Sequence, residues 1–477
     1  MTRLEYDIII IGGGIAGLGS ASILSANGYN VLVIDRKKLL GGRCQSYEKE
    51  GFIIDTNFHA FEKSNKGAHG EICKLSNVEP MPFDYFKGKF NPELNYLNKR
   101  GLKWPDGIVS VVPQEAIQTF MKMTMNIYIL KEQEIAQYDS ITVKDWVDKH
   151  TTNKQIHTIF SFLTNMSFAY EYQEIACGEL FRVIRSLFDA SFLKGTRWFG
   201  YPTGGCQAIP KYYKNIITYN KGTILAGQEF EVKRIIIEEN NATGVELKNG
   251  DIYSAKIIIS NAGVKLTTNR LVGEKYFPTD YIKKVKNIIP SFSASAIKVA
   301  LKKKLTNEKC ITYVSTEEPI EYWNEVKKGK IPEFVDLFGT VPSNSDPNLA
   351  PKGKQLIVIG TLTPLGLNQD FKKWGESIYN SLLTFMPEVE SNLEWYDISS
   401  PMTINELVGN EGKGIKAAQI PGQIGKSRFS FKTPIENLFY ACDETGTGGV
   451  GTELAGNSAI QIANHILKNY VRKEVRI

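Results

Sequence analysis

The sequence predicts an α/β fold with a parallel sheet, and both ends of the chain carry the pattern that predicts it. Near the N-terminus, Tyr6–Ile11 is a short β-branched run, Ile15–Ala26 has a helical pattern and Tyr29–Ile34 is a second apolar run. Near the C-terminus, Asn437–Cys442 has the composition of a strand, and a helical pattern over about Thr452–Leu467 follows a glycine-rich loop. Strands that alternate with helices form parallel sheets covered by helices.

The composition is that of a globular protein with two or three domains. The chain has 477 residues, of which 42% are hydrophobic and 23% are charged. The cysteines form no Cys-x-x-Cys pair and the histidines show no metal-ligand spacing, so we predict no metal site. The formal charge of +6 is mild, and no basic block predicts a nucleic-acid partner. Free thiols favour a reducing, cytoplasmic location.

The glycine pattern after the first strand predicts a dinucleotide site. Gly12, Gly14 and Gly17 form G-x-G-x-x-G between a strand and a helix, which is the setting that this fingerprint requires. Gly12 makes the turn, Gly14 lets a pyrophosphate approach the backbone, and Gly17 lets helix and strand pack closely. The helix N-terminus favours the negative pyrophosphate, and Asp35 at the end of the second strand can bind a ribose diol. We therefore predict a Rossmann-like domain, for NAD or FAD.

Two further segments distinguish these cofactors. Leu40-Gly41-Gly42-Arg43 follows the second strand, and Asp443 with the glycine-rich loop 446–451 follows the last one. With these segments the chain resembles the flavoprotein superfamily of amine oxidases, protoporphyrinogen oxidases and carotenoid (phytoene) desaturases. The resemblance implies that Arg43 lies at the FAD phosphates, that Asp443 bonds the ribityl chain, and that the last helix points at the flavin N1–C2=O edge. A helix N-terminus stabilises the negative charge of reduced flavin there.

We expect FAD to be bound without a covalent link. Cys442 is predicted to lie inside the last strand, and no motif matches the amine-oxidase cysteine that forms such a link. The resemblance also implies that a β-rich segment in the middle of the chain contacts adenine through the backbone of Val232. The predicted cofactor-binding residues are Gly12, Gly14, Ile15, Ala16, Gly17, Asp35, Arg36, Gly42, Arg43, Val232, Asp443, Gly451 and Thr452.

The predicted FAD-binding domain is discontinuous, because its segments come from both ends and the middle of the chain. It takes residues 1–80, 203–265 and 425–477, and an inserted α+β substrate domain takes residues 81–202 and 266–424. The first part of the inserted domain is predicted to be mainly helical. Within it, the aromatic segment Ile159–Tyr172 either lines an apolar tunnel or forms a helix core.

The segment Arg197–Gly205 indicates the substrate class. Its residues Tyr201, Pro202, Gly204 and Gly205 match the Y-P-x-G-G segment of the desaturase and isomerase branch of the superfamily. The resemblance implies an FAD-dependent oxidoreductase that desaturates, saturates or isomerises carbon–carbon bonds of an apolar, isoprenoid or carotenoid-like small molecule. Tyr201 either faces that substrate or packs in the core.

Lys298 is the candidate catalytic residue. It lies in the predicted strand Ser291–Leu301, and a comparable strand of amine oxidases carries a lysine that holds water near flavin N5. A lysine on the polar face of a strand is the alternative. Two other functions stay open: oxidation of C–N or ring C–H bonds, as in amine oxidases or protoporphyrinogen oxidases, and an FAD-holding scaffold without turnover.

Contact with a membrane is a further prediction, with a merely solvated surface as its alternative. No stretch of the sequence reaches the ~18 apolar residues that a membrane span needs. Peripheral docking would use the methionines of Phe120–Met125 together with basic C-terminal residues. These basic residues are Lys468, Arg472, Lys473 and Arg476. The sequence does not predict the oligomeric state.

Overall fold

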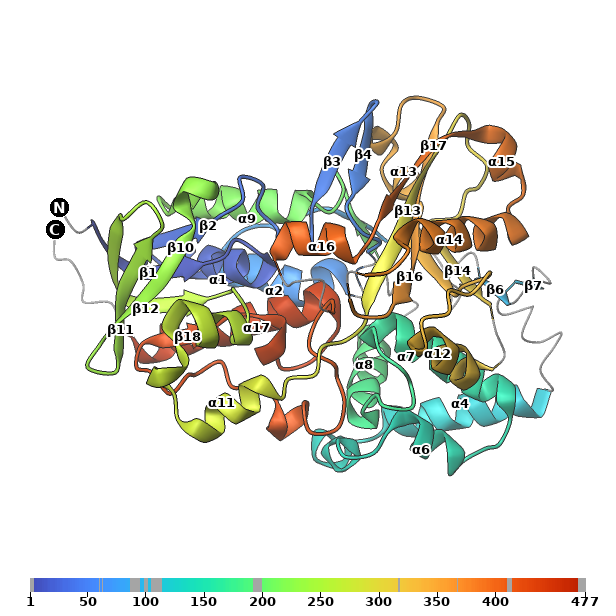
Figure 1. The fold of residues 1–477 in the computed structure, drawn as a ribbon, viewed down its shortest axis with the longest axis horizontal. Coiled ribbons are helices and arrows are strands. Elements are labelled where there is room, and N and C mark those ends of the chain that lie inside the picture. Colours follow the sequence, from blue (N-terminus) through green and yellow to red (C-terminus); the bar gives the residue numbers. More distant parts are fainter. Residues whose placement is uncertain are drawn as a thin grey trace.

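Two large β-sheets, each accompanied by helices, make up the computed structural model (Figure 1). The structure describes residues 4–59, 61, 63–85, 95–97, 102–103, 114–191, 200–315, 318–366, 368–409 and 414–470. Residues 197–199 of the segment Arg197–Gly205 and the basic residues 472, 473 and 476 therefore lie outside the described residues. Among the described residues, no helix has both the length and the apolar character needed to cross a membrane.

The first sheet is parallel over five strands, which confirms the predicted α/β class. These strands are β18 (Leu438–Tyr440), β12 (Ile252–Ser260), β1 (Leu4–Ile11), β2 (Val31–Asp35) and β9 (Thr223–Ala226). β10 (Val232–Glu238) and β11 (Asn241–Leu247) continue the sheet as an antiparallel pair beside β12. Because the five strands run in one direction, their carboxyl ends meet at one edge of the sheet, where ligands of such sheets bind.

Helices cover this sheet and share one apolar core with it. They are α1 (Ile15–Ala26), α2 (Ala68–Leu75), α9 (Ala208–Tyr219) and α17 (Gly451–Asn469). Every residue of α1 from Ile15 to Ser25 is buried, because α9, α17 and the sheet enclose this helix. The N-terminal and C-terminal helices α1 and α17 thus pack together, which brings the two ends of the chain into one unit (Figure 1).

The second sheet is mainly antiparallel and lies beside the first (Figure 1). Its strands are β17 (Leu393–Ser399), β13 (Ser293–Leu301), β16 (Gln355–Thr363), β15 (Leu337–Thr340), β14 (Cys310–Val314), β6 (Asn95–Leu97) and β7 (Leu102–Lys103). Helix α14 (Phe371–Phe385) packs on one face. The hairpin β3 (Ser46–Lys49) and β4 (Phe52–Asp55) packs on the other, with Phe52 and Ile54 against Ala300 of β13.

A group of helices extends from the second sheet, as predicted for the first part of the inserted domain (Figure 1). They are α4 (Gln114–Tyr128), α5 (Glu132–Ile135), α6 (Val143–Asp148), α7 (Lys154–Phe168) and α8 (Cys177–Ser191). The remaining elements are β5 (Phe83–Tyr85), β8 (Gly200–Pro202), α10 (Val264–Leu266), α11 (Thr279–Lys286), α12 (Pro319–Lys327), α13 (Pro342–Ser345), α15 (Glu388–Asn392) and α16 (Pro401–Val408). The exact domain boundaries stay a prediction.

Candidate functional site: a dinucleotide cradle and an apolar chamber

The glycine turn between β1 and α1 is built around a side chain that comes from β12. Asn261 follows β12 directly, its Oδ1 accepts from the Gly14 N–H at 3.0 Å, and its Nδ2 donates to the Ala441 carbonyl at 2.5 Å. A Cβ on Gly14 would lie 2.6 Å from Asn261 Oδ1, so Gly14 is required by this contact as well as by an approaching ligand. A Cβ on Gly17 would lie 2.1 Å from the Gly12 carbonyl oxygen, which confirms its predicted packing role.

The carboxylate at the end of β2 faces the same turn. Asp35 accepts hydrogen bonds from the N–H groups of Gly13 and Lys37, both at 2.7 Å. Burial raises the pKa of the Asp35 carboxyl, and these two donors oppose the rise. A carboxylate has about four acceptor positions, so Asp35 can still accept from two ribose hydroxyls. Arg36 and Val232 line the cavity beside it.

The next residues show how the two ends of the chain meet. Arg43 Nη2 lies 3.2 Å from Asp443 Oδ2, with 33% of the arginine side chain and 16% of the aspartate side chain exposed. Gly42 has a left-handed backbone conformation (φ +62°) and lies close to Gly14. A Cβ on Gly42 would come 3.5 Å from the Cα of Gly14. The two residues predicted from opposite ends of the sequence therefore form one charged pair at the cavity wall.

The loop before α17 also borders the cavity. Val450 is the N-cap of α17, and Gly451 and Thr452 begin this helix with their backbone at the cavity. The first N–H groups of a helix have no partner within it, so they can bind an anionic or carbonyl group. The Thr452 hydroxyl is already hydrogen bonded to His69 Nε2 at 3.1 Å. Burial lowers the pKa of His69 to about 4, so this partner is neutral.

Cys442 does not lie inside the last strand, where the sequence predicted it. β18 ends at Tyr440, so Cys442 lies after the strand, where it caps a short turn at Asp443–Thr445 and lines the cavity. Its thiol is buried and faces the Thr445 hydroxyl at 3.7 Å, and burial raises the pKa of this thiol well above its usual value. A thiol that stays protonated is a poor nucleophile, which is a better reason to expect no covalent flavin link than its place in a strand.

Glu444 is a cavity residue that the sequence did not single out. Its Oε2 accepts from the Val264 N–H at 2.7 Å. Burial and the neighbouring Asp443 carboxylate raise the pKa of Glu444 to about 6. Asn261 and Glu444 could have been found from one rule, because both follow the carboxyl ends of parallel strands.

A continuous cavity of about 1030 Å³ extends from these residues to the inserted helices and the second sheet. We call its first part the dinucleotide cradle, which is lined by Gly12, Gly14, Asp35, Arg43, Asn261, Asp443, Glu444 and Gly451. We call the rest of the cavity the apolar chamber. It is lined by residues of α4, α7, α8, β13, β14, β15 and α16 and by residues 414–417. Ile159, Phe162, Leu163 and Met166 of α7 contribute to its wall. The segment Ile159–Tyr172 therefore does both: part of α7 lines the cavity, while Phe168 and Tyr172 pack in the core of the helical group.

Lys298 is 2% exposed and is not among the described residues that line this cavity, although Ala294 of the same strand is. It lies opposite Val358 and Asp397 in the register of β13. Burial lowers the pKa of Lys298 to about 7, and the charges of Asp397 and Asp55 oppose this fall. A catalytic role for Lys298 stays a prediction.

Tyr201 packs in the core and not at the cavity. It is 1% exposed, and its hydroxyl donates to Asp55 Oδ2. Asp55 also accepts from the Ser46 hydroxyl at 2.7 Å, and from the N–H and thiol of Cys206 at 3.0 and 2.9 Å. The segment that matches Y-P-x-G-G is thus held to the end of β4 by one buried carboxylate.

The same carboxylate belongs to a group of three side chains with the spacing of metal ligands. Ligand atoms of Asp55, His59 and Cys206 all lie within 4.8 Å of one another, and this is the one such group among the described residues. Both oxygens of Asp55 already accept two hydrogen bonds each. Burial raises the pKa of the Cys206 thiol and lowers that of His59. A protonated thiol and a saturated carboxylate describe a hydrogen-bonded cluster better than a metal site.

The sequence profile of a family described as flavin-containing amine oxidoreductases matches residues 15–467. The chain belongs to this family. As a member of it, the protein is a flavin-dependent oxidoreductase enzyme, and FAD is its expected cofactor. The match covers both sheets except β1, which precedes it together with Gly12 and Gly14.

Individual relatives are distant. The inactive all-trans-retinol 13,14-reductase of Danio rerio is 22% identical, with 95% of this chain and 84% of that protein covered. Prolycopene isomerase 2 of an Oncidium hybrid cultivar is 23% identical, with 97% and 84% covered. A triple mutant of putrescine oxidase has a similar fold, with a TM-score of 0.71 at 13% identity over 98% of this chain and 99% of that one.

The residues present fit FAD. The cavity is bordered by the glycine turn, by the N-termini of α1 and α17, and by Arg43. The carboxylates of Asp35 and Asp443 border it as well. Backbone N–H groups and arginine suit phosphates, whereas carboxylates suit sugar and ribityl hydroxyls. The cavity thus offers hydrogen-bond donors for the phosphates of FAD and acceptors for its ribose and ribityl hydroxyls.

Proposed function

We propose that the protein binds FAD non-covalently and uses it to desaturate, saturate or isomerise carbon–carbon bonds of an apolar, isoprenoid or carotenoid-like substrate. The observation that carries this proposal is the continuity of the cavity, which connects the dinucleotide cradle with the apolar chamber. Bound FAD supplies a hydride acceptor or donor. An apolar substrate in the chamber would then reach the flavin without crossing bulk water.

Each group of residues has a role in this proposal. The N–H groups of Ile15 and Ala16 and the guanidinium of Arg43 bind the phosphates, while Asp35 and Asp443 bind hydroxyls. Gly451 begins α17, and a Cβ there would meet nothing within 4 Å, so this helix end is open for the flavin ring. The chamber walls orient the substrate and exclude water by apolar contact.

The charge of the chamber favours carbon–carbon chemistry over oxidation of an amine. Among the described residues that line the chamber there is no carboxylate, and the one charged side chain is that of Lys416. A protonated amine would find no carboxylate among these described lining residues and would meet the ammonium of Lys416. Two relatives whose names refer to polyenes, a prolycopene isomerase and an inactive all-trans-retinol 13,14-reductase, also support a polyene substrate.

The test uses the purified protein as isolated. We expect a yellow protein whose flavin is released by denaturation and identified as FAD. Under anaerobic conditions, phytoene, prolycopene, retinol and putrescine are added in turn, and flavin absorbance and product are followed. A change in flavin absorbance and formation of product with a polyene, but not with putrescine, supports the proposal. Bleaching by putrescine alone favours the amine-oxidase alternative, and FAD that never responds to any compound favours a scaffold.

We also propose that the outer face of α4 docks on a membrane. Met121, Met125 and Ile129 repeat at i, i+4 and i+8 and are 42%, 44% and 74% exposed. The same helix presents Phe120 and Thr124 to the chamber, so a lipid-facing stripe would lie on the back of a chamber wall. Flotation with anionic liposomes should be lost in the double variant Met121→Lys/Met125→Lys, and flotation that the double variant retains would contradict this face.

A further inference from the structure

Three hydrogen-bonded side chains connect the core of the first unit to the start of α17. The hydroxyl of Tyr213 in α9 lies 2.8 Å from His69 Nδ1, and His69 Nε2 lies 3.1 Å from the Thr452 hydroxyl. Tyr213 and His69 are completely buried, whereas Thr452 lines the cavity as the second residue of α17. The three side chains therefore run from the interior to the wall of the cavity beside the dinucleotide cradle.

The direction of the two hydrogen bonds follows from burial. Because burial lowers the pKa of His69 to about 4, its ring is neutral, and one ring nitrogen donates while the other accepts. If Nδ1 carried the hydrogen, Tyr213 would accept from it, and the phenolic hydrogen would be buried without an acceptor among the described residues. An unpaired buried donor is costly, so Tyr213 donates to Nδ1 and Nε2 carries the hydrogen.

This arrangement gives Thr452 a hydrogen to donate. Its oxygen accepts from His69 Nε2, and within the described parts of the chain its hydroxyl has no further partner. Gly451 beside it is open, since a Cβ there would meet nothing within 4 Å. The hydroxyl can therefore donate to a ligand in the cradle, in addition to the N–H groups at the start of the helix.

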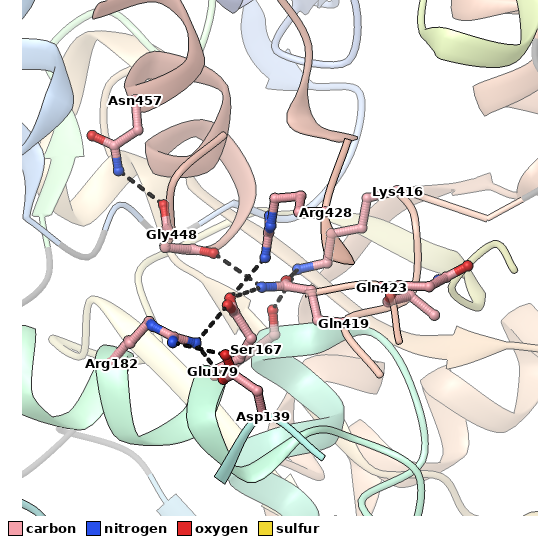
Figure 2. A network of polar contacts seen from close by, with 12 residues as sticks. Asp139, Ser167, Glu179, Arg182, Lys416, Gln419, Gln423, Arg428, Gly448 and Asn457 are labelled. Atoms are coloured by element: carbon pink, nitrogen blue, oxygen red, sulfur yellow. Dashed lines mark hydrogen bonds and ion pairs between the residues drawn. The ribbon is translucent and has the colours of Figure 1, made fainter. Parts of the chain in front are cut away.

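The loop before α17 is anchored from the side of the inserted helices. Gln419 Nε2 lies 3.4 Å from the Gly449 carbonyl oxygen. Figure 2 shows Gln419 between Glu179 and Lys416, to which it is bonded at 2.6 and 2.7 Å. Because the backbone that leads into the helix is held in this way, the direction of the hydroxyl is what the buried histidine controls at Thr452.

We propose that Tyr213 and His69 hold the Thr452 hydroxyl as a hydrogen-bond donor to the flavin. The inference rests on the proposed function, since it takes FAD as the ligand of the cradle. Tyr213 and His69 are positioning residues, because neither is among the described residues that line the cavity. A hydroxyl donates more strongly to an acceptor that carries negative charge, so it stabilises the reduced flavin more than the oxidised form. The hydroxyl should therefore raise the midpoint potential of the flavin.

A simple tie between two helices is the competing explanation. Glu453 Oε2 of α17 accepts from the Ala68 N–H of α2 at 2.7 Å, so these helices are already joined beside His69. Such a tie would affect stability and would not depend on which ring nitrogen of His69 carries the hydrogen. The test must therefore measure the tautomer of His69 and the potential of the flavin.

The first measurement is the tautomer of His69 in the FAD-loaded protein, by ¹⁵N NMR of the imidazole rings. The chain has five histidines, and the signals that disappear in His69→Gln identify the ring. We expect the form with hydrogen on Nε2. The form with hydrogen on Nδ1 would overturn the inference, because Thr452 would then donate to His69 and not to a ligand.

The second measurement is the two-electron midpoint potential of the flavin, obtained by reduction against reference dyes. In Thr452→Val the hydroxyl is lost, and we expect the affinity for reduced FAD relative to oxidised FAD to fall about tenfold. This fall lowers the midpoint potential by about 30 mV. Thr452→Ser keeps a hydroxyl and should keep a potential close to that of the unaltered protein.

His69 should act on the potential only through Thr452. His69→Met removes the ring that directs the hydroxyl, and should lower the potential by less than Thr452→Val does. In the Thr452→Val background the same substitution should cause no further shift, because no hydroxyl is left to direct. His157→Met is the matched control, since His157 Nδ1 pairs with the Tyr172 hydroxyl at 2.9 Å outside the described cavity lining. It should leave the potential unchanged.

The outcomes separate this inference from the proposed function. An unchanged potential in Thr452→Val, or a shift in His69→Met that persists in full without the hydroxyl, overturns the inference alone. Failure of the unaltered protein to bind FAD refutes the proposed function and this inference together.

Discussion

The two ends of the cavity are built by different means. At the cradle, backbone N–H groups, glycines and carboxylates at strand ends make the contacts, and each lies within a few residues of β1, β2, β12 or β18. At the chamber, side chains from helices and strands far apart in the sequence make an apolar wall. The geometry of the cradle therefore depends mainly on the backbone, whereas that of the chamber depends on which side chains line it.

The largest expected effect concerns the buried carboxylate that holds the Y-P-x-G-G segment to the end of β4, outside both ends of the cavity. Asp55 is 1% exposed and accepts four hydrogen bonds from Ser46, Tyr201 and Cys206. In Asp55→Ala these buried donors lose their acceptor, and we expect the free energy of unfolding in urea to fall by about 3–5 kcal/mol. Tyr201→Phe removes one donor and should cost about 1–2 kcal/mol. A loss below about 1 kcal/mol in Asp55→Ala would show that these four hydrogen bonds do not hold the segment in place.

The second effect concerns the buried ammonium of Lys298 in β13, in the second sheet. Because the pKa of Lys298 is lowered to about 7, the folded protein binds fewer protons than the unfolded chain between pH 7 and about 10. Stability should therefore rise with pH through this window. Lys298→Met removes the cost of the buried charge and should stabilise the protein at pH 6 by ~3 kcal/mol, with the difference shrinking towards pH 10. Urea titrations at several pH values measure this, and a pH-independent difference would refute the buried-charge explanation.

A third variant tests the backbone precision of the cradle. Gly17→Ala places a Cβ 2.1 Å from the Gly12 carbonyl, so the turn must shift, at a cost of about 1–3 kcal/mol and with loss of bound flavin. Gly19→Ala is the matched control in the same helix. Its Cβ would meet Ile72 Cδ1 at 2.9 Å and Ala459 Cβ at 3.1 Å, which is a smaller overlap than that of Gly17 and involves no backbone atom. Flavin content after purification checks both, and equal retention in the two variants would argue against a rigid turn.

The smallest expected effect on stability is that of the pair between the chain ends. Arg43 and Asp443 are partly exposed, so their coupling in a double-mutant cycle of the flavin-free protein should stay below about 1 kcal/mol. Flavin affinity should nevertheless fall in both Arg43→Ala and Asp443→Ala, because each substitution removes a predicted contact with the cofactor. Thermal unfolding and flavin titration separate the two outcomes. A coupling energy above about 2 kcal/mol would show that the ion pair mainly stabilises the fold and does not mainly serve flavin binding.

Elements that depend on local sequence signals can be predicted from the sequence, whereas contacts between distant segments cannot. Helix α1 was predicted with its observed bounds, because a β-branched run, a glycine turn and a helical pattern are local signals. Asn261 was overlooked as a ligand-site residue, since its role depends on β12 lying beside β1. Cys442 was placed inside a strand that ends earlier, which is the usual error at element boundaries.

The sequence by itself determined the flavin-type cradle: the strand, the glycine turn, the helix, and the acids and arginine that follow them. Only the tertiary structure decided which polar groups share a contact, such as Asp55 with Tyr201 and Gln419 with Glu179 and Lys416. The apolar chamber likewise depends on packing between α4, α7, α8 and the second sheet. Backbone geometry is encoded within a few residues, whereas burial and charge compensation depend on partners that only folding brings together.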